Sequence, residues 1–420
     1  MTDVVHMTKP VLEVTTKQSP APPEMSLGLD PSAAPPFPVG YQHLHDDISL
    51  NFQLNRWLMW AGPSAITDLR TVAPQIHNYD DWKREFLRLA GEALAAGRTL
   101  PGAIYLRAAE FYMLSSDPNK HPSRQRFVDL MRRVYRSEAS HRYTVPYETG
   151  FLPVYRVTGG TKGTIVLFGG FDSYIENFFP IMLYLARAGY DVVGFEGPGQ
   201  GGALEDYGLK MTPAWERPVG AVLDYFDLDD VTLLGMSLGG CLAIRAAAFE
   251  PRIHRVIAFD VLFDFLDAHL SKTSPFAREL VRLLLGLRAN FLLDRFVGYG
   301  MRQSLLLQWA IEQGEHVFGV NTPSGYFDAA SRYNTALVSK SVTCDVLLLA
   351  GSEDHYVPLN QFHQQAAALR NAASLTCRIF TRADHAQNHC QYGNVGLALD
   401  VILSWLNQIS LRPPPNDPEM

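Results

Sequence analysis

The sequence predicts an α/β protein with a mostly parallel, doubly wound sheet, a helical N-terminal domain and a helical insertion that caps the sheet. From residue 143 onward, short apolar runs rich in β-branched residues alternate with helical segments, as expected for strands buried on both faces. In residues 52–137 the apolar side chains follow helical spacing instead. Residues 262–339 are helical by spacing and too long for an ordinary crossover between strands.

The N-terminal part divides into an arm and a helical domain. The first forty residues are rich in proline and poor in large apolar side chains, so burial cannot offset their ordering entropy. We expect residues 1–40 to form an extended or disordered arm. Residues 41–140 should form four or five helices, because apolar positions in Trp82–Leu94 and Ile104–Met113 recur three and four residues apart.

The sheet is expected in two parts, residues 141–261 and residues 340–410, followed by a tail at 411–420. One helix is expected at Phe178–Ala188, between the third and fourth strands. Active sites of such sheets collect at the carboxyl ends of the strands. The expected strands are 144–147, 152–157, 163–168, 190–195, 231–234, 256–259, 346–349 and 375–380.

The insertion at residues 262–339 has helical spacing and is rich in leucine and aromatic residues. Its helices are expected at Phe276–Leu287, Phe291–Val297 and Met301–Gln313. A helical cap of this composition over the strand ends predicts an apolar substrate pocket closed from water.

Composition narrows the function classes. The chain has 420 residues, 47% hydrophobic and 19% charged, which suits one large core and a smaller accessory one. Its net charge of -7 and the lack of a Lys/Arg block argue against nucleic acid or an anionic membrane as partner. With no secretion signal and no membrane-length apolar stretch, a cytoplasmic location is expected. The four cysteines show no ligand-like pairing with histidine, which predicts free thiols and no metal site.

The segment Gly235-Met236-Ser237-Leu238-Gly239-Gly240 joins an apolar strand to an alanine-rich helix. A strand that turns sharply into a helix through Gly-x-Ser-x-Gly presents the serine hydroxyl above the sheet. Glycine is needed on either side because the turn is strained and the strand and helix cross closely. Ser237 is therefore the candidate nucleophile.

A serine nucleophile requires a base and an acid that orients the base, and both should follow the serine in this kind of sheet. Asp354 comes directly after the strand at 346–349 and is the preferred acid. Glu353 is its nearest competitor, and Asp260 after the preceding strand is a weaker one. Two histidines, His385 and His389, follow the last strand, and loop length alone does not choose between them.

The oxyanion formed by serine attack needs backbone N–H donors, each worth about 3 kcal/mol of barrier. The amide of Leu238 is one candidate, and the amide of Phe171 is the other, because Gly169-Gly170 lets the loop approach closely. The segment Glu196–Gly202 is expected to shape the pocket floor. Its glycines match neither a Walker loop nor a dinucleotide motif, so no cofactor is expected.

Several stretches together resemble the α/β-hydrolase superfamily, and within it a branch with a helical N-terminal domain. That branch includes 2,6-dihydroxypseudooxynicotine hydrolase and the fungal heptaketide hydrolyase of pigment synthesis. The resemblance extends over most of residues 100–405. The stretches that carry it are Arg107–Met113, Phe168–Ser173, Phe195–Gly201, the serine segment and Asn388–Asn394.

The resemblance implies roles for individual residues. In that branch the histidine of the His-Cys-Gln-x-Gly-Asn string looks catalytic, which places the base on His389. An acidic residue after the Gly-Gly loop participates in the nicotine-degrading member, and the matching position here is Asp172, one methylene shorter than that enzyme's glutamate. Asp172 and Gly170 are therefore assigned to substrate binding, with a helix N-cap as the alternative role of Asp172. A homodimer is also implied.

The resemblance predicts a serine hydrolase that cleaves a carbon-carbon bond next to a ketone, or an ester, in a polyketide-derived intermediate. The alternative on the same fold is an acyltransferase or cyclisation catalyst acting on a polyketide or a polyketide-amino acid hybrid. A non-catalytic binding protein is the third hypothesis, and the order Ser237, Asp354, His389 argues against it.

Overall fold

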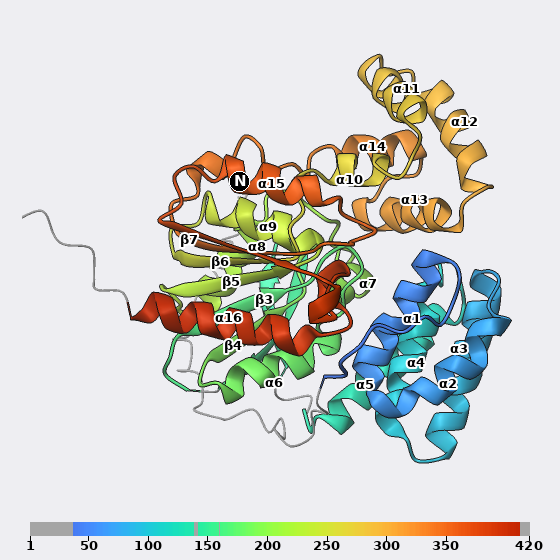
Figure 1. Ribbon diagram of the computed structural model, residues 1–420, viewed down its shortest axis with the longest axis horizontal. Coiled ribbons are helices and arrows are strands. Elements are labelled where there is room, and N and C mark those ends of the chain that lie inside the picture. The colour runs from blue at the N-terminus through green and yellow to red at the C-terminus, as the bar shows by residue number, and fades with distance from the viewer. Residues whose placement is uncertain (1–36, 138–141, 159, 412–420) are drawn as a thin grey trace, which may run out of the picture.

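The computed structural model describes residues 37–137, 142–158 and 160–411. Its centre is an eight-stranded sheet in the order β1-β2-β4-β3-β5-β6-β7-β8 (Figure 1). β2 pairs antiparallel with β1 and β4, and the remaining pairs are parallel, so the mostly parallel sheet is confirmed. The strands are β1 Arg142–Tyr147, β2 Gly150–Val157, β3 Thr164–Phe168, β4 Asp191–Phe195, β5 Val231–Met236, β6 Ile253–Phe259, β7 Asp345–Gly351 and β8 Ser374–Phe380. The arm expected at residues 1–40 lies outside the described residues up to residue 36, as does the tail from residue 412.

Both faces of the sheet are buried, which explains the apolar character of its central strands. Ile165 and Leu167 of β3 belong to one core, and Val166 and Phe168 belong to the other, as alternation along a strand requires. The first core includes residues of two helices on that face, and the second includes residues of three helices on the opposite face. These helices are α6 Phe179–Arg187 and α16 Val395–Ser410 on the first face, and α8 Glu216–Phe226, α9 Leu238–Ala247 and α15 Leu359–Ala368 on the second.

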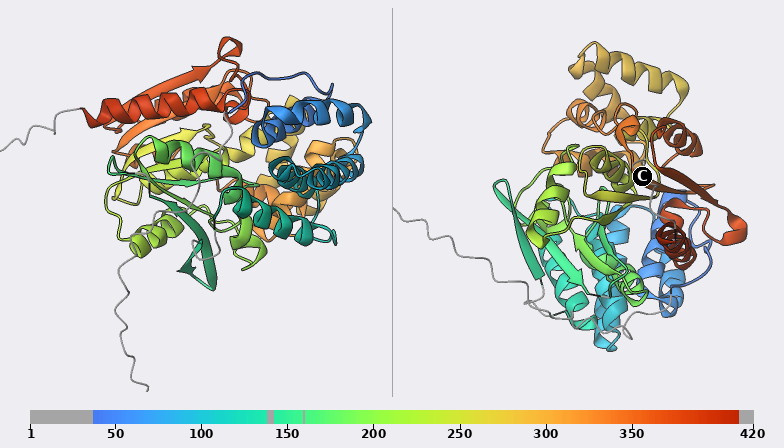
Figure 2. Two further views of the ribbon diagram at one scale, coloured as in Figure 1. Left: turned by 90° about the horizontal axis from the view of Figure 1, so that it is seen from below. Right: turned by 90° about the vertical axis from the view of Figure 1, so that its left-hand side faces the viewer.

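An N-terminal helical region packs beside the sheet (Figures 1 and 2). Its apolar side chains continue the first core without a break. Within it, the Trp82 indole donates to the Ala108 carbonyl at 2.8 Å and ties two helices together. Its α-helices are α1 Ile48–Ala61, α2 Ile66–Val72, α3 Tyr79–Ala95, α4 Thr99–Phe111 and α5 Lys120–Val134.

Five α-helices lie between β6 and β7, and they continue the second core. The sequence predicts a helix beginning at Met301, but that residue ends one helix and the next begins at Leu305. The reason is Ser304, whose side chain accepts from the Leu307 amide and caps the later helix. α11 and α12 project away from the sheet (Figure 2). The five are α10 Phe265–Leu270, α11 Pro275–Gly286, α12 Asn290–Met301, α13 Leu305–Phe318 and α14 Pro323–Ala330. Within the described part of the chain, no helix combines the length and apolar character that crossing a bilayer requires.

Candidate active site

Ser237 occupies the sharp turn between β5 and α9. Its backbone has φ 60° and ψ -124°. Residues other than glycine rarely adopt this conformation, which marks a strained turn. A Cβ on Gly235 would lie 2.0 Å from the Gly239 carbonyl oxygen, and one on Gly239 would lie 2.7 Å from the Gly169 carbonyl oxygen. Both glycines of the motif are therefore required by close backbone approach, as the sequence predicts.

Three sequence-predicted side chains meet at this turn. Nε2 of His389 lies 2.7 Å from the Ser237 hydroxyl, and its Nδ1 lies 2.6 Å from Oδ2 of Asp354. Asp354 follows β7, and its Oδ1 accepts from the amides of Tyr356 and Val357, which fixes the carboxylate. A proton can pass along this arrangement from the hydroxyl to the imidazole.

The competing residues are held elsewhere. His385 is exposed, with a left-handed backbone (φ 57°) in the loop after β8. Glu353 pairs with Arg382 at 2.5 Å on the surface. The structure thus brings His389 and Asp354, and neither His385 nor Glu353, to Ser237.

The imidazole and carboxylate perturb each other strongly. Burial disfavours the charged form of His389, but the adjacent Asp354 outweighs burial and raises the pKa of His389 well above its ordinary value. Burial also opposes ionisation of Asp354, yet His389 keeps the pKa of Asp354 below that of a free aspartate. The pair therefore favours an ionised carboxylate that orients and stabilises an imidazolium.

Asp260 adds a second buried carboxyl to the same site. It follows β6, and its Oδ2 lies 3.5 Å from Nδ1 of His389 and accepts from the Cys390 amide at 3.0 Å. Burial, and then the charge of Asp354, raise the pKa of Asp260 well above its usual value. These surroundings favour the neutral form of Asp260 beside the ionised form of Asp354. Asp260, Asp354 and His389 lie close enough to hold a metal ion, but both ring nitrogens of His389 are already engaged.

Two backbone amides are available beside the serine. Among the described residues, no acceptor takes the amide proton of Leu238 or of Phe171. A Cβ on Gly170 would lie 2.9 Å from the Leu238 nitrogen and 3.0 Å from Cβ of Ser237. Only glycine lets the loop after β3 come this close to the turn, and the proximity suits an oxyanion hole.

The segment Glu196–Gly202 holds the loop after β3 in place through hydrogen bonds. Nε2 of Gln200 donates to the carbonyl oxygens of Gly169 and Gly170 at 2.6 and 3.0 Å. The Glu196 carboxylate accepts from the amides of Ile175 and Gly202. The expectation that this segment shapes the pocket floor is wrong, because none of its residues lines the cavity at Ser237.

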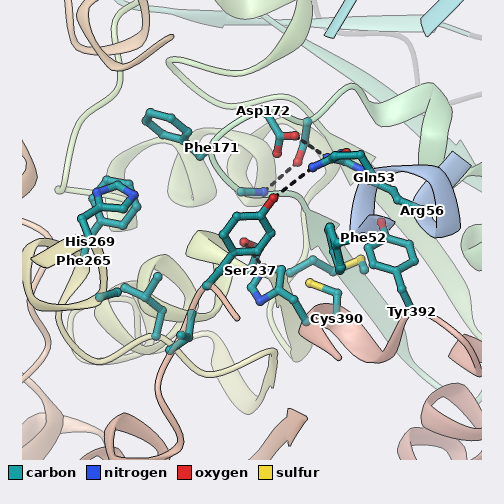
Figure 3. A pocket seen from close by; sticks show the side chains of 18 of the residues that line it. Phe52, Gln53, Arg56, Phe171, Asp172, Ser237, Phe265, His269, Cys390 and Tyr392 are labelled. Carbon is teal, nitrogen blue, oxygen red and sulfur yellow. Dashed lines mark hydrogen bonds and ion pairs between the residues drawn. The ribbon is translucent and has the colours of Figure 1, made fainter. Parts of the chain in front are cut away.

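A cavity opens at the serine, between the sheet, α1 and the helices that follow β6 (Figure 3). His269 of α10 contributes a neutral ring, since burial lowers its pKa to about 4, and the ring accepts or donates a hydrogen bond at the Tyr326 hydroxyl. The walls are mainly aromatic and aliphatic. Most of the lining consists of Phe52, Gln53, Arg56, Gly170, Phe171, Asp172, Phe178, Met236, Leu262, Phe265, His269, Trp309, Tyr356, Val357, Cys390 and Tyr392.

Asp172 points into this cavity and does not cap a helix. The short helix after it, Ile175–Phe178, has Tyr174 at its N-cap and no side-chain cap. The N-cap alternative is therefore wrong, because Oδ2 of Asp172 accepts from Nη1 of Arg56 at 2.5 Å (Figure 3). Sequence reasoning missed Arg56. The available signal was a lone charged residue in the largely apolar stretch Ile48–Ala61.

The sequence matches a known protein family and several fungal proteins. The profile described as "alpha/beta hydrolase fold" matches residues 163–388, more than half of the chain. The chain is 28% identical to hydrolyase ccsE of Aspergillus clavatus, with 72% of this chain and 82% of that protein covered. It is 29% identical to hydrolyase poxO of Penicillium oxalicum, with 73% and 83% covered.

Solved structures share the fold. 2,6-Dihydroxy-pseudo-oxynicotine hydrolase superposes with a TM-score of 0.57 at 21% identity, covering 84% of this chain and 95% of that one. AbyA5 superposes with a TM-score of 0.61 at 19% identity, covering 86% and 95%. At these identities the likeness concerns the fold alone.

Proposed function

This chain belongs to the alpha/beta hydrolase family and is a hydrolytic enzyme, and we propose that Ser237 is its covalent nucleophile. The observation that carries the proposal is the continuous hydrogen-bonded series from Ser237 through His389 to Asp354, at 2.7 and 2.6 Å. A serine hydroxyl is a weak nucleophile unless a neighbouring base removes its proton, and His389 is in position to do so.

The reaction follows from the positions of these groups. Oγ of Ser237 attacks the substrate carbonyl while His389 takes the hydroxyl proton, and the amides of Leu238 and Phe171 stabilise the oxyanion. Collapse of the intermediate breaks the bond to the leaving group, and His389 delivers its proton to that group. Water, deprotonated by His389, then attacks the acyl ester, and the acid product leaves with Ser237 restored.

For the substrate we propose a polyketide-derived intermediate, cleaved at a carbon-carbon bond next to a ketone or at an ester. The mainly aromatic and aliphatic walls support an apolar substrate. The sequence resemblance around Asn388–Asn394 supports the carbon-carbon alternative. A departing carbon needs an adjacent carbonyl that takes up its charge as an enolate before protonation.

Ser237→Ala tests the nucleophile with p-nitrophenyl hexanoate as substrate. We expect turnover to fall by about 10⁵-fold or more, and a fluorophosphonate probe to label the wild type at Ser237 but not the variant. Ser331→Ala, at an exposed serine after α14, is the control and should retain full activity. Near-normal turnover in the Ser237→Ala variant would reject covalent serine catalysis.

Product mass separates hydrolysis from cyclisation or transfer to another acceptor. With the natural substrate in H₂¹⁸O, hydrolysis places one ¹⁸O atom in the acid product. An unlabelled product with no added water would instead support the acyltransferase or cyclisation alternative.

A further inference from the structure

We propose that the Arg56–Asp172 ion pair is the polar recognition site for the substrate, and that it binds a neutral group carrying a hydrogen-bond acceptor beside a donor. A carboxamide, a lactam and the enol of a 1,3-dicarbonyl share this chemistry. The inference rests on the proposed function, because it concerns the same cavity, and it specifies which substrates that cavity selects.

The pair places two charged groups in a wall that is mainly aromatic and aliphatic. Phe52, Gln53 and Arg56 project from one side of α1 into the cavity, and Asp172 reaches them from the loop after β3 (Figure 3). The side chains of Arg56 and Asp172 are 11% and 18% exposed. Because both line the cavity, this remaining surface is available to a ligand there.

Several hydrogen-bonding atoms in this cluster have no partner. Arg56 donates through Nη1 alone, and its Nε and Nη2 have no acceptor among the described residues. Oδ1 of Asp172 has no donor there either, and Oε1 of the buried Gln53 is likewise unpartnered. Of these atoms, Nε of Arg56 and Oε1 of Gln53 are buried, and a buried hydrogen-bonding atom without a partner carries a free-energy cost. A ligand that accepts from Arg56 and donates to Asp172 or Gln53 would remove that cost.

Charge decides which kind of group fits. Burial opposes the charge on Arg56, but Asp172 outweighs it and keeps the pKa of Arg56 above its ordinary value, so the pair carries one positive and one negative charge. A ligand carboxylate would add an uncompensated negative charge to this buried site, which is costly. A neutral donor-acceptor group leaves the balance intact.

Two aromatic rings lie close to the Arg56 guanidinium and restrict its movement. Its guanidinium lies 4.8 Å from the Trp57 ring centroid and 5.2 Å from that of Phe111. A guanidinium held this way presents its donors in one plane. A planar group such as an amide or enol can meet that plane edge to edge.

Five p-nitrophenyl esters test the proposal, and the four that carry a polar group all place its first carbonyl carbon at position 6 of the acyl chain. They are the hexanoate, the 6-oxoheptanoate with an acceptor only, the 5-carboxypentanoate with an anion, the 5-carbamoylpentanoate with an amide, and the 6,8-dioxononanoate with an enolisable 1,3-diketone. We expect the amide and diketone esters to exceed the ketone and carboxylate esters at least tenfold in kcat/KM, mainly through KM. Comparing kcat/KM for the amide ester with kcat/KM for the diketone ester shows which of the two groups the site prefers.

Variants of Arg56 and Asp172 test whether the preference for the amide ester depends on this pair. Arg56→Met and Asp172→Asn should reduce the ratio of amide to ketone kcat/KM to within about twofold of unity, and Arg56→Lys should recover only part of it. Arg156→Met breaks a comparable pair with Asp191, and Arg156 is not among the cavity residues. This control should keep the wild-type ratio.

The outcomes are separable from those of the proposed function. Hexanoate hydrolysis that persists in Ser237→Ala refutes the serine mechanism. Hydrolysis that requires Ser237 but shows no preference among the five esters in the wild type, or a tighter KM for the carboxylate ester, refutes the recognition site alone. A preference that survives both Arg56→Met and Asp172→Asn also refutes it.

Discussion

His389 lies between one hydroxyl and two carboxyl groups whose protonation states differ. The imidazole and its hydrogen bonds lower the pKa of Asp354 and favour its ionised form, whereas burial and the charge of Asp354 raise the pKa of Asp260 and favour its neutral form. Two carboxyl groups this close cannot both ionise at low cost. The division of roles follows from their surroundings, since the two side chains are chemically identical.

The two carboxyl groups should therefore respond differently to substitution. Asp354→Asn should lower kcat by about 10⁴-fold, the size of effect known when the orienting acid of a serine triad becomes an amide. Asp260→Asn should change kcat by less than about tenfold, because an amide, like the neutral carboxyl group of Asp260, can donate a hydrogen bond to Asp354. Steady-state hydrolysis of p-nitrophenyl hexanoate measures both. A larger loss in Asp260→Asn than in Asp354→Asn would reverse the assignment.

The pH dependence of kcat/KM reports the protonation of His389. Only the neutral imidazole can take the Ser237 proton, and its pKa in the folded enzyme is raised above the ordinary 6.5. Activity is therefore present above the raised pKa and lost as pH falls through it, so the acidic limb should lie above pH 6.5. In Asp354→Asn the limb should move to lower pH, because the neighbouring negative charge is removed. A wild-type limb at or below pH 6.5 would contradict this assignment.

Single residues differed in how far the sequence could predict them. The positions of Ser237 and Asp354 beside the cavity were predictable, because the Gly-x-Ser-x-Gly turn and the end of β7 both lie at the carboxyl edge of the sheet. His389 and His385 were not separable by loop length, since the path of the loop after β8 decides which ring reaches the serine. Arg56 was not predicted because its partner Asp172 is 116 positions away, and no local pattern links the two.

At the scale of elements, α4 connects the N-terminal helices to the loop that carries Phe171. Arg107 of α4 donates to the Asp172 carbonyl at 2.5 Å and to Glu110 at 2.6 Å. Glu110 also accepts from Lys120 and from the Tyr174 hydroxyl, at 2.5 and 2.8 Å. This buried network holds the loop at the carboxyl edge of the sheet.

Glu110→Gln should destabilise the fold by about 3–5 kcal/mol, because removing one member of a buried ionic network leaves its partners uncompensated. Urea unfolding followed by circular dichroism measures the change. Glu92→Gln, which breaks an exposed pair with Arg88, is the matched control and should cost at most about 1 kcal/mol. Equal losses in the two variants would show that the network at Glu110 does not stabilise the fold.

The order of strands and helices was predictable because apolar periodicity changes sharply along this chain. The helix boundaries in the segment between β6 and β7 were less predictable. There the apolar pattern runs through Met301, and the break depends on a single cap at Ser304. The orientation of these helices over the cavity depends on long-range packing that periodicity does not encode.

For the whole molecule, the two cores make the helical segments part of one structure with the sheet. One core joins α1–α5 to one sheet face, and the other joins the helices between β6 and β7 to the opposite face. We expect a single cooperative thermal transition, seen at the same temperature by calorimetry and by tryptophan fluorescence. Two separate transitions would show that the N-terminal helices fold independently of the sheet.

The architecture could be predicted at this scale, but the cavity could not. Its walls come from α1, the loop after β3, α10 and α13, segments that are far apart in the sequence. Their meeting depends on how the helical segments pack against the sheet edge. The apolar composition of the cap predicted an apolar pocket, but it did not predict the Arg56–Asp172 pair in the wall of that pocket.

Trapping the acyl-enzyme tests the central claim most directly. Wild-type protein mixed with p-nitrophenyl hexanoate is quenched in acid within milliseconds, digested and analysed by mass spectrometry. Covalent catalysis by Ser237 predicts a hexanoyl group on the peptide that contains Ser237, formed with the first burst of p-nitrophenol. A hexanoyl group on another residue, or wild-type turnover that persists after a fluorophosphonate probe has modified Ser237, would contradict it.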